Sequence, residues 1–263
     1  GAQDTSSPYG VTWDTTALSN GTHSLTAVAR DAAGNSTTSA AVGVTVSNAP
    51  PPPPASGLVA AYGFEEASGA TVTDRSGAGN TGTITGATRI TTGRFGSALS
   101  FNGTTNFVSI PDSASLDLTT GMTLEAWIYQ AANTNYRTVI IKEAAGDLAY
   151  ALYGASTYGS SSAHRPSAWL GPDDLGGTAA LAANTWKHLA TTYDGTTWKL
   201  YVDGVQVASK AYTKPIPTSN SPLKIGGNAV WGEFFSGRID EVRVYDHGLT
   251  AAEVQGDMNR AVD

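Results

Sequence analysis

The sequence predicts an all-β protein, an antiparallel β-sandwich of the jelly-roll type, on three observations. Only 14% of its residues are charged and 30 are glycine, a balance typical of β-structure with many turns. From Met122 to Tyr129, Met122, Leu124, Ala126 and Ile128 fall on one face, a period of two that marks a strand with one core face. Short strand candidates also follow one another without crossover helices, which favours antiparallel pairing.

The first 48 residues contain three strand candidates, Tyr9–Trp13, His23–Arg30 and Ala40–Ser47. The turn signals Asn20-Gly21 and Gly34-Asn35 lie between them. Three strands are too few to close a two-sheet core. We therefore expect this segment to leave an exposed strand edge.

A proline-rich stretch follows, with five consecutive prolines at residues 50–54. Consecutive prolines favour an extended polyproline II spacer without internal hydrogen bonds. The sequence therefore predicts a small domain over 1–48, a linker over 49–56 and a larger jelly-roll domain over 57–263.

The larger domain is a succession of short strand candidates. In chain order they are Leu58–Phe64, Ala98–Asn102, Phe107–Ile110, Met122–Tyr129, Thr138–Lys142, Leu148–Tyr153, Trp186–Tyr193, Thr197–Val202, Val205–Lys210, Leu223–Gly226 and Gly237–Asp246. Asp194-Gly195 and Asp203-Gly204 predict tight hairpins, because both central residues of such turns need positive φ. The stretch 74–82 is predicted to be a loop. Thr250, with Glu253 three residues later, forms a capping box that predicts a short final helix.

The order of several motifs resembles the laminin-G-like, concanavalin A-like jelly roll. These motifs are GRFGSALSFNG, TLEAW, NTWKHLATTYDG followed by LYVDG, and GRIDEVRVYDHGLTAAEV. The stretch WDTTALSNGTHSLTAVARDAAGN near the start resembles the last strands of a bacterial immunoglobulin-like domain. The jelly-roll family includes lectins and accessory modules of secreted polysaccharide-degrading enzymes, so the resemblance implies a binding module.

The carboxylates do not predict catalysis. Glycosidases need two carboxylates at a defined separation, and enzymes that share this fold carry them on one strand as E-x-D-x-x-E or E-x-D-x-E. Glu125 has no acidic neighbour two or four residues on, and the adjacent Asp240 and Glu241 face opposite sides of a strand. The chain also lacks a G-x-S-x-G serine motif and any cysteine nucleophile. We therefore predict that the module is not an enzyme.

The charge balance narrows the class of partner. The net charge is −7 and there is no basic run, which argues against nucleic acid, since phosphate binding depends on Lys and Arg. No apolar run is long enough to span a membrane. A cysteine-free β chain rich in Thr, Ser and Gly fits a secreted bacterial protein.

A structural calcium is predicted where the first and last strands of the jelly roll meet. There, Glu65 or Glu66 would lie near Asp240, and carboxylate oxygens are the ligands that Ca²⁺ prefers. IDEVRVY also resembles the terminal strand of fold relatives that keep such an ion with the matching Asp. The alternative is that Asp240 is a solvated residue on an edge strand.

A sugar-binding surface needs exposed aromatic rings beside polar side chains, because sugars have apolar C–H faces and hydroxyl edges. We assign Trp127, Trp186 and Trp198, which lie in predicted strands, to packing. Residues in predicted loops are the candidates for binding, with pinning of the loops onto the sandwich as the alternative role. They are Tyr136, Arg137, Tyr158, Trp169, Asn228, Trp231 and Glu233.

Together these features predict a non-catalytic carbohydrate-binding module of a secreted bacterial multidomain protein, with a structural calcium and a polysaccharide as partner. Three alternatives remain open. One is an adhesion module that binds protein, and another is a structural spacer of a cell-surface protein. The third and least favoured is a glycoside hydrolase or polysaccharide lyase, which would require distant carboxylates to converge in a cleft.

Overall fold

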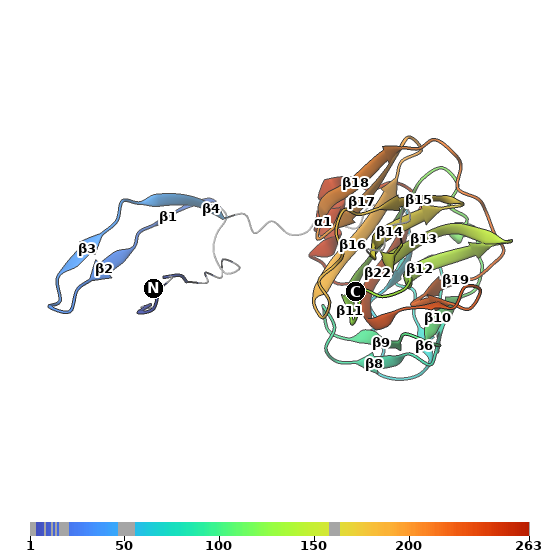
Figure 1. Ribbon diagram of the computed structural model, residues 1–263, viewed down its shortest axis with the longest axis horizontal. Coiled ribbons are helices and arrows are strands. Elements are labelled where there is room, and N and C mark those ends of the chain that lie inside the picture. Colours follow the sequence, from blue (N-terminus) through green and yellow to red (C-terminus); the bar gives the residue numbers. More distant parts are fainter. Residues whose placement is uncertain are drawn as a thin grey trace. The chain divides into compact units, whose positions relative to one another are not determined.

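The computed structural model describes residues 4–7, 9–11, 13, 15, 21–46, 56–157 and 164–262. The chain divides into two compact units, Gly1–Pro51 and Pro52–Asp263 (Figure 1). The linker predicted over 49–56 lies outside the described residues apart from residue 56. Its ends therefore stay a prediction.

The first unit contains two antiparallel strand pairs. β1 (Gly21–Leu25) pairs with β4 (Val42–Val46), and β2 (Val28–Arg30) pairs with β3 (Ser36–Thr38). The single strand predicted over His23–Arg30 is therefore two strands, and β3 was not predicted. The strand predicted over residues 9–13 is wrong for the described part, since 9–11 and 13 lie in no strand.

The apolar side chains of these strands are largely uncovered. Leu25, Val28 and Val42 are all exposed, because a two-stranded pair has no second layer on which to bury them. The exposed strand edge expected from the sequence is therefore present in the described residues.

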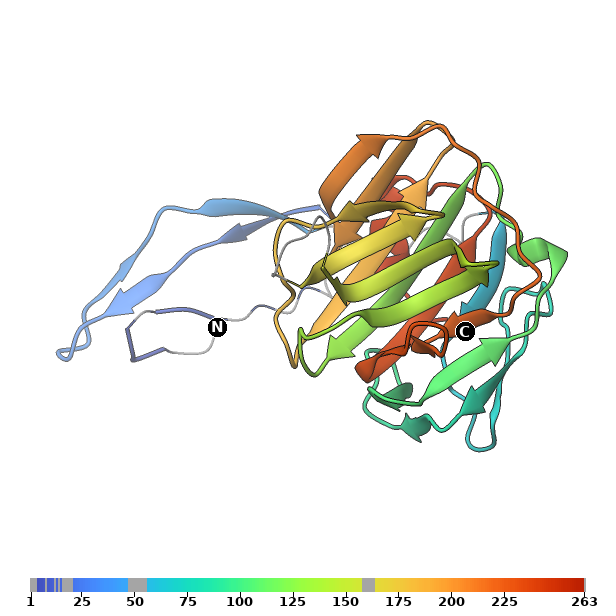
Figure 2. The ribbon, with the colours of Figure 1, turned by 45° about the vertical axis from the view of Figure 1, so that its right-hand side comes forward.

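The second unit is an antiparallel β-sandwich, which confirms the predicted all-β fold class. Two eight-stranded sheets face each other (Figure 2). Sheet I has the order β18 (Val205–Ala211), β17 (Thr197–Val202), β16 (Trp186–Tyr193), β11 (Met122–Gln130), β22 (Ser236–Tyr245), β9 (Ala98–Asn102) and β8 (Thr88–Ile90), with β5 (Leu58–Tyr62) also paired to β22. Sheet II has the order β15 (Asp173–Gly176), β14 (Arg165–Leu170), β13 (Asp147–Ser156), β12 (Arg137–Ala144), β19 (Leu223–Ile225), β10 (Phe107–Ile110), β7 (Gly82–Thr85) and β6 (Thr71–Val72).

Strands with clear alternation begin and end where the sequence predicts. β9, β10, β16 and β17 match the predicted bounds residue for residue. Strands that carry misleading signals were not predicted. β14 contains Pro166 next to its first residue, and proline argues against a strand in a paired position. β6 is only two residues long, too short to show a period, and β15, with the sequence DDLG, has a single apolar side chain.

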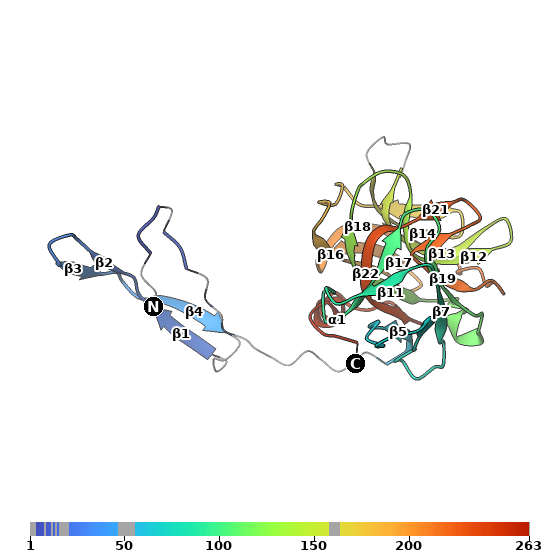
Figure 3. The ribbon, with the colours of Figure 1, turned by 90° about the horizontal axis from the view of Figure 1, so that it is seen from below.

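The period of two in β11 is confirmed, but only one of its faces had been expected to be buried. Met122, Leu124, Ala126 and Ile128 lie in the core between the sheets. On the other face Glu125 is also fully buried, because the helix α1 (Ala251–Met258) and the chain after it cover that part of sheet I. Figure 3 shows α1 beside the strands of this sheet.

The predicted helix cap is present at the start of α1. The Thr250 hydroxyl accepts a hydrogen bond from the Glu253 amide at 3.3 Å, and the Glu253 carboxylate accepts one from the Thr250 amide at 2.8 Å. Both bonds satisfy amides that the first turn of a helix leaves unpaired.

We expect Thr250→Ala to lower the free energy of unfolding by about 1 kcal/mol, since the alanine cannot accept the amide hydrogen bond. Urea denaturation measures this change. Thr250→Ser keeps the hydroxyl and should unfold at the wild-type urea concentration. Equal stability of the alanine variant and the wild type would contradict the prediction.

Candidate functional site

Three aromatic side chains form a row on the outer face of sheet II. The ring centroids of Tyr136 and Tyr153 lie 5.7 Å apart, and those of Tyr153 and Trp169 lie 6.5 Å apart. Both contacts are edge-to-face, with interplanar angles of 82° and 72°. We call these three residues the aromatic row. Tyr136 directly precedes β12, while Tyr153 and Trp169 come from β13 and β14, in the green-to-yellow layer of Figure 2.

The pleat of the strands points these rings outward. Leu152 packs in the core between the sheets, so the next residue, Tyr153, faces away from it. In β14 the same alternation turns Ala168 and Leu170 inward and Trp169 outward. The rings rest on a small apolar cluster that Ile141, Leu148 and Ala151 form on the outer face.

A hydrogen-bond chain links the row to the loop that carries Trp231. The Tyr153 hydroxyl donates to Glu233 Oε2 at 2.9 Å, and Asn228 Nδ2 donates to the same oxygen at 3.0 Å. Asn228 Oδ1 accepts from the Trp231 amide at 2.9 Å. Burial, together with the neighbouring Glu233 carboxylate, raises the pKa of Tyr153 well above its usual value. The phenol is therefore a hydrogen-bond donor over the whole physiological pH range.

This chain of bonds holds the short hairpin of β20 (Gly227–Asn228) and β21 (Glu233–Phe234) beside the row. Trp231, between the two strands, is 43% exposed. The site therefore combines a partly covered aromatic platform with an exposed indole ring and an accessible carboxylate.

The structure corrects the predicted roles of two residues. Asn228 is fully buried, and Arg137 is nearly so. The Arg137 guanidinium donates to the Phe234 carbonyl at 2.9 Å and to Thr134 Oγ1 at 3.0 Å. Both side chains therefore hold the β20–β21 hairpin in place and do not form the binding surface.

Two further placements differ from the sequence prediction. Trp169 lies on strand β14 and not in a loop, and the rings occupy a sheet face where a cluster of edge loops had been expected. Tyr158 lies outside the described residues. The sequence interpretation missed Tyr153, although its position next to the apolar Leu152 in an alternating strand would have placed it on the outer face.

Three acidic residues gather at the other predicted site. β5 pairs with β22, so the chain after β5 brings Glu65 to Asp240 as expected. Asp240 Oδ2 accepts from the amides of Arg94 and Phe95 at 2.7 and 3.1 Å, and Glu65 Oε1 accepts from the Ser97 amide at 2.7 Å.

The alternatives for this acidic site can now be decided. Asp240 is fully buried in an interior strand, so the interpretation as a solvated edge residue is wrong. Glu66 points elsewhere, with Oε2 2.7 Å from Arg89 Nη1. Glu241 joins Glu65 in lining a pocket of about 270 Å³, and this second carboxylate was not predicted.

Burial destabilises the charged forms of these acids. It raises the pKa of Asp240 to about 7 and that of Glu241 to about 8, with a further contribution from the Glu65 carboxylate. Glu241 Oε1 is buried without a hydrogen-bond partner. Among the described residues, no group of three or more His, Cys, Asp or Glu side chains is arranged to hold a metal ion, so a cation here would also need backbone carbonyls or water.

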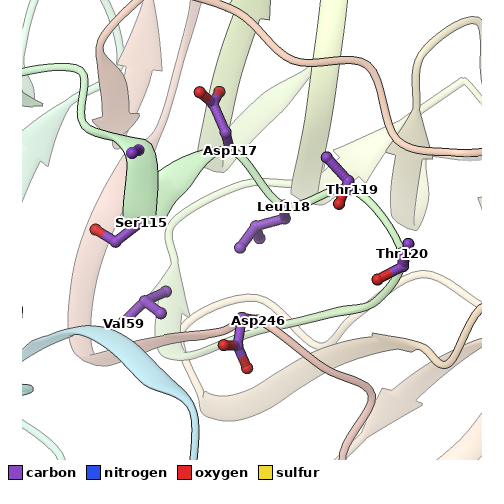
Figure 4. A pocket seen from close by; sticks show the side chains of 8 residues that line it. Val59, Ser115, Asp117, Leu118, Thr119, Thr120 and Asp246 are labelled. Atoms are coloured by element: carbon purple, nitrogen blue, oxygen red, sulfur yellow. The ribbon is translucent and has the colours of Figure 1, made fainter.

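A further pocket of about 330 Å³ lies between Val59 and the segment that follows β10, with Asp117 and Asp246 at its rim. Figure 4 shows both carboxylates pointing away from its centre. Asp117 accepts from the Ser219 amide at 3.3 Å. The two acids therefore do not form a facing pair of the kind that glycoside hydrolysis requires.

Comparison with known families agrees with this fold. Residues 102–255 match the laminin-G-type model of the concanavalin A-like lectin/glucanase superfamily, and residues 1–27 match a bacterial Ig domain model. The chain belongs to the concanavalin A-like lectin/glucanase superfamily, as its motifs predicted. No helix among the described residues is long and apolar enough to cross a membrane.

Solved structures share the fold at low sequence identity. Domain 4 of AbnA, an extracellular arabinanase from Geobacillus stearothermophilus in complex with arabinotriose, is 24% identical, with a TM-score of 0.62 over 78% of this chain and 98% of that one. A putative carbohydrate binding protein from Bacteroides ovatus is 23% identical, with a TM-score of 0.51 over 60% of this chain and 46% of that one. Mouse pappalysin-1 is 36% identical over 78 residues, which are 28% of this chain and 5% of that protein.

Proposed function

We propose that the chain is a non-catalytic carbohydrate-binding module of a secreted bacterial multidomain protein. Its binding surface would be the two partly exposed rings of the aromatic row, Tyr136 and Trp169, together with Trp231 and Glu233, while the buried Tyr153 supports them from beneath. The observation that carries the proposal is the row itself, three neighbouring rings on one sheet face with a carboxylate hydrogen-bonded to the central phenol. Rings pack on the C–H faces of sugars, and a carboxylate accepts hydrogen bonds from their hydroxyls.

The comparisons support the same class of ligand. The arabinanase domain of similar fold is described in complex with arabinotriose, and the Bacteroides ovatus relative is described as a putative carbohydrate binding protein. The absence of catalysis is part of the proposal. It is supported by the two rim carboxylates of the larger pocket, which point away from each other (Figure 4).

We expect Trp169→Ala to weaken binding of neutral polysaccharides at least tenfold, because loss of one stacked ring removes more than about 1.4 kcal/mol of contact energy. Tyr153→Phe tests the hydrogen bond to Glu233 separately from the ring. Affinity electrophoresis through gels that contain arabinan, xylan or β-glucan measures the retardation, and calorimetry with the retarding glycan gives the Kd.

Trp13→Ala is the matched control. This ring is 38% exposed and lies in the first unit, so its loss should leave retardation unchanged. The proposal fails if wild-type protein binds no glycan on a broad array, or if the Trp169 and Tyr153 variants bind as tightly as the wild type. Retention of a protein ligand in the same assay, with no glycan bound, would favour the adhesion alternative.

A structural calcium at Glu65 and Asp240 is the second part of the proposal. The donor set fits a hard cation, since both residues offer carboxylate oxygens, and the buried Glu241 Oε1 beside them lacks a partner. An ion there would fix the loop after β8 to β22 and would supply no chemistry. The Discussion gives its test.

A further inference from the structure

α1 covers only part of the outer face of sheet I. Beneath the helix, Tyr201 and Tyr245 pack with Leu249 and Val254. Further along β11 and its neighbours, the same face carries Tyr129 and Trp186, both partly exposed. The sequence had assigned Trp186 to packing alone. An aromatic surface therefore continues beyond the edge of the helix.

Two arginines lie on the rings of this surface. The Arg238 guanidinium lies 4.8 Å from the Tyr129 ring centroid, and that of Arg94 lies 4.4 Å from the Trp127 centroid. Strand pairing places Trp186 and Arg238 on either side of Tyr129, with the Tyr129 and Trp186 centroids 5.7 Å apart. We call Arg94, Phe95, Trp127, Tyr129, Trp186 and Arg238 the arginine–aromatic patch.

The positive charge of the patch is not neutralised by an acidic partner. Among the ion pairs of the described ranges, Arg89, Arg243 and Arg260 each have a carboxylate, whereas Arg94 and Arg238 have none. Arg238 Nη1 makes only a 3.2 Å hydrogen bond to Thr92 Oγ1 and a 3.4 Å contact with its carbonyl.

The acids on the same face of the sheet are buried. Glu125 and Glu241 lie beside Arg243 and not beside the patch. Asp240 is fully buried, and its oxygens accept from the amides of Arg94, Phe95 and Glu241. It therefore faces the backbone of the loop and not the two guanidinium groups.

The two cations lie over rings of the same strand, an arrangement that offers a polymer with repeated carboxylates two neighbouring partners. Trp127 and Tyr129 are two residues apart on one strand, which separates the rings beneath the two guanidiniums by about 7 Å. A guanidinium stacked on a ring keeps its N–H edges free to bind a carboxylate with two hydrogen bonds. The exposed parts of Tyr129 and Trp186 offer the faces on which sugar rings pack.

We propose that the arginine–aromatic patch is a second binding site, specific for a polysaccharide that carries uronic acid carboxylates. Charge complementarity selects this occupant. The protein as a whole has a net charge of −7, which repels polyanions, so a polyuronate would bind only where cations lie together without acidic partners. The site lies on the sheet opposite the aromatic row and does not depend on the function proposed for that row.

The test is binding of the full chain to polygalacturonate by affinity electrophoresis and calorimetry. We expect wild-type binding that weakens as NaCl rises, and at least a tenfold loss of affinity in the Arg94→Gln, Arg238→Gln double variant. Trp186→Ala should also weaken binding without changing the charge.

Arg30→Gln, which removes an exposed arginine from β2 in the first unit, is the control and should bind like the wild type. Arg94→Lys keeps the charge and loses the planar fork, so it should bind more weakly than the wild type, and melting temperatures report whether each variant is folded.

Each result bears on the proposal. Absence of wild-type binding to polygalacturonate would overturn it, as would unchanged binding by a folded double variant. Equal binding of poly-glutamate that is lost in the same variant would overturn the specificity for a glycan. Loss of polygalacturonate binding in Trp169→Ala, with the double variant unaffected, would move the acidic ligand to the aromatic row and overturn the second site.

Discussion

Replacing Arg243 with methionine is expected to lower the free energy of unfolding by about 3–5 kcal/mol above pH 8, because Glu241 is ionised there and loses its cation. Arg243 is 2% exposed and its Nη2 lies 3.2 Å from Glu241 Oε2. The strand register also places it opposite Glu125, a fully buried carboxyl neither of whose oxygens has a hydrogen-bond partner. One guanidinium therefore compensates two buried acids.

Methionine fills a similar volume, so the expected loss comes from the acids left without a cation and not from a cavity. Guanidinium chloride unfolding at pH 9, above the folded Glu241 pKa of about 8, measures it. Arg165→Met, at the partly exposed start of β14, is the matched control and should change stability by less than about 0.5 kcal/mol. An Arg243→Met protein as stable as the wild type would show that Glu125 and Glu241 are already neutral in the folded protein.

The second large effect is a loss of stability between pH 5 and pH 8 when calcium is removed. Asp240 has a usual pKa of 3.8 and a folded value of about 7, and Glu241 has 4.5 and about 8. Above pH 4 the unfolded chain has released these protons while the folded protein still binds them. The stabilisation is therefore complete in acid and is lost as the pH rises through the folded pKa values.

A tenfold difference in proton affinity corresponds to about 1.4 kcal/mol, so the loss should amount to several kcal/mol in EGTA. The carboxyls whose pKa is lowered, such as Glu66 and Asp194, change stability only below about pH 5, at the edge of this range. Buried His188, whose pKa falls from 6.5 to about 3, lowers stability as the pH drops below about 6.5, so it offsets part of the loss between pH 5 and pH 6.5. Urea unfolding at pH 5, 6, 7 and 8 gives the profile.

Calcium should reverse this trend, because a cation favours the charged carboxylates. We expect 1 mM CaCl₂ to raise the melting temperature at pH 8 and to have little effect at pH 5. Asp240→Asn removes both the titration of that group and a proposed ligand, so it should make the pH profile shallower, with the part due to Glu241 remaining, and abolish the calcium response. No calcium response of the wild type at pH 8 would refute the metal site, while the pH profile in EGTA would stand as a separate test of the buried acids.

His188 and Glu125 illustrate that local sequence can predict a strand position but not the burial of a side chain. The sequence places each of them on a strand, and the structure pairs these two strands, with His188 Nε2 3.8 Å from Glu125 Oε2. Nothing in either strand indicates that α1 covers them, so their burial could not be predicted. Burial lowers the pKa of His188 to about 3, so the ring is neutral at physiological pH.

In the candidate site, too, neighbouring residues in the sequence determine the strands, whereas the contacts between side chains depend on the tertiary structure. Alternation and turn residues determined the strands β9, β10, β16 and β17, and the motif order determined the jelly-roll family, because both depend on neighbours in the chain. Which rings meet is a matter of strand pairing. Tyr153 joins Tyr136 and Trp169 only because β12, β13 and β14 are adjacent in sheet II.

The sequence by itself thus determined an antiparallel sandwich, its capped final helix and the meeting of its first and last strands at Asp240. Only the tertiary structure decided that Arg137 and Asn228 are buried supports, that Tyr153 is central to the aromatic row, and that Trp186 shares a sheet face with Arg94 and Arg238, which have no carboxylate partner among the described residues. The physical reason is that a period of two assigns a side chain to a face, whereas contact and exposure depend on the strand order and on what packs over that face.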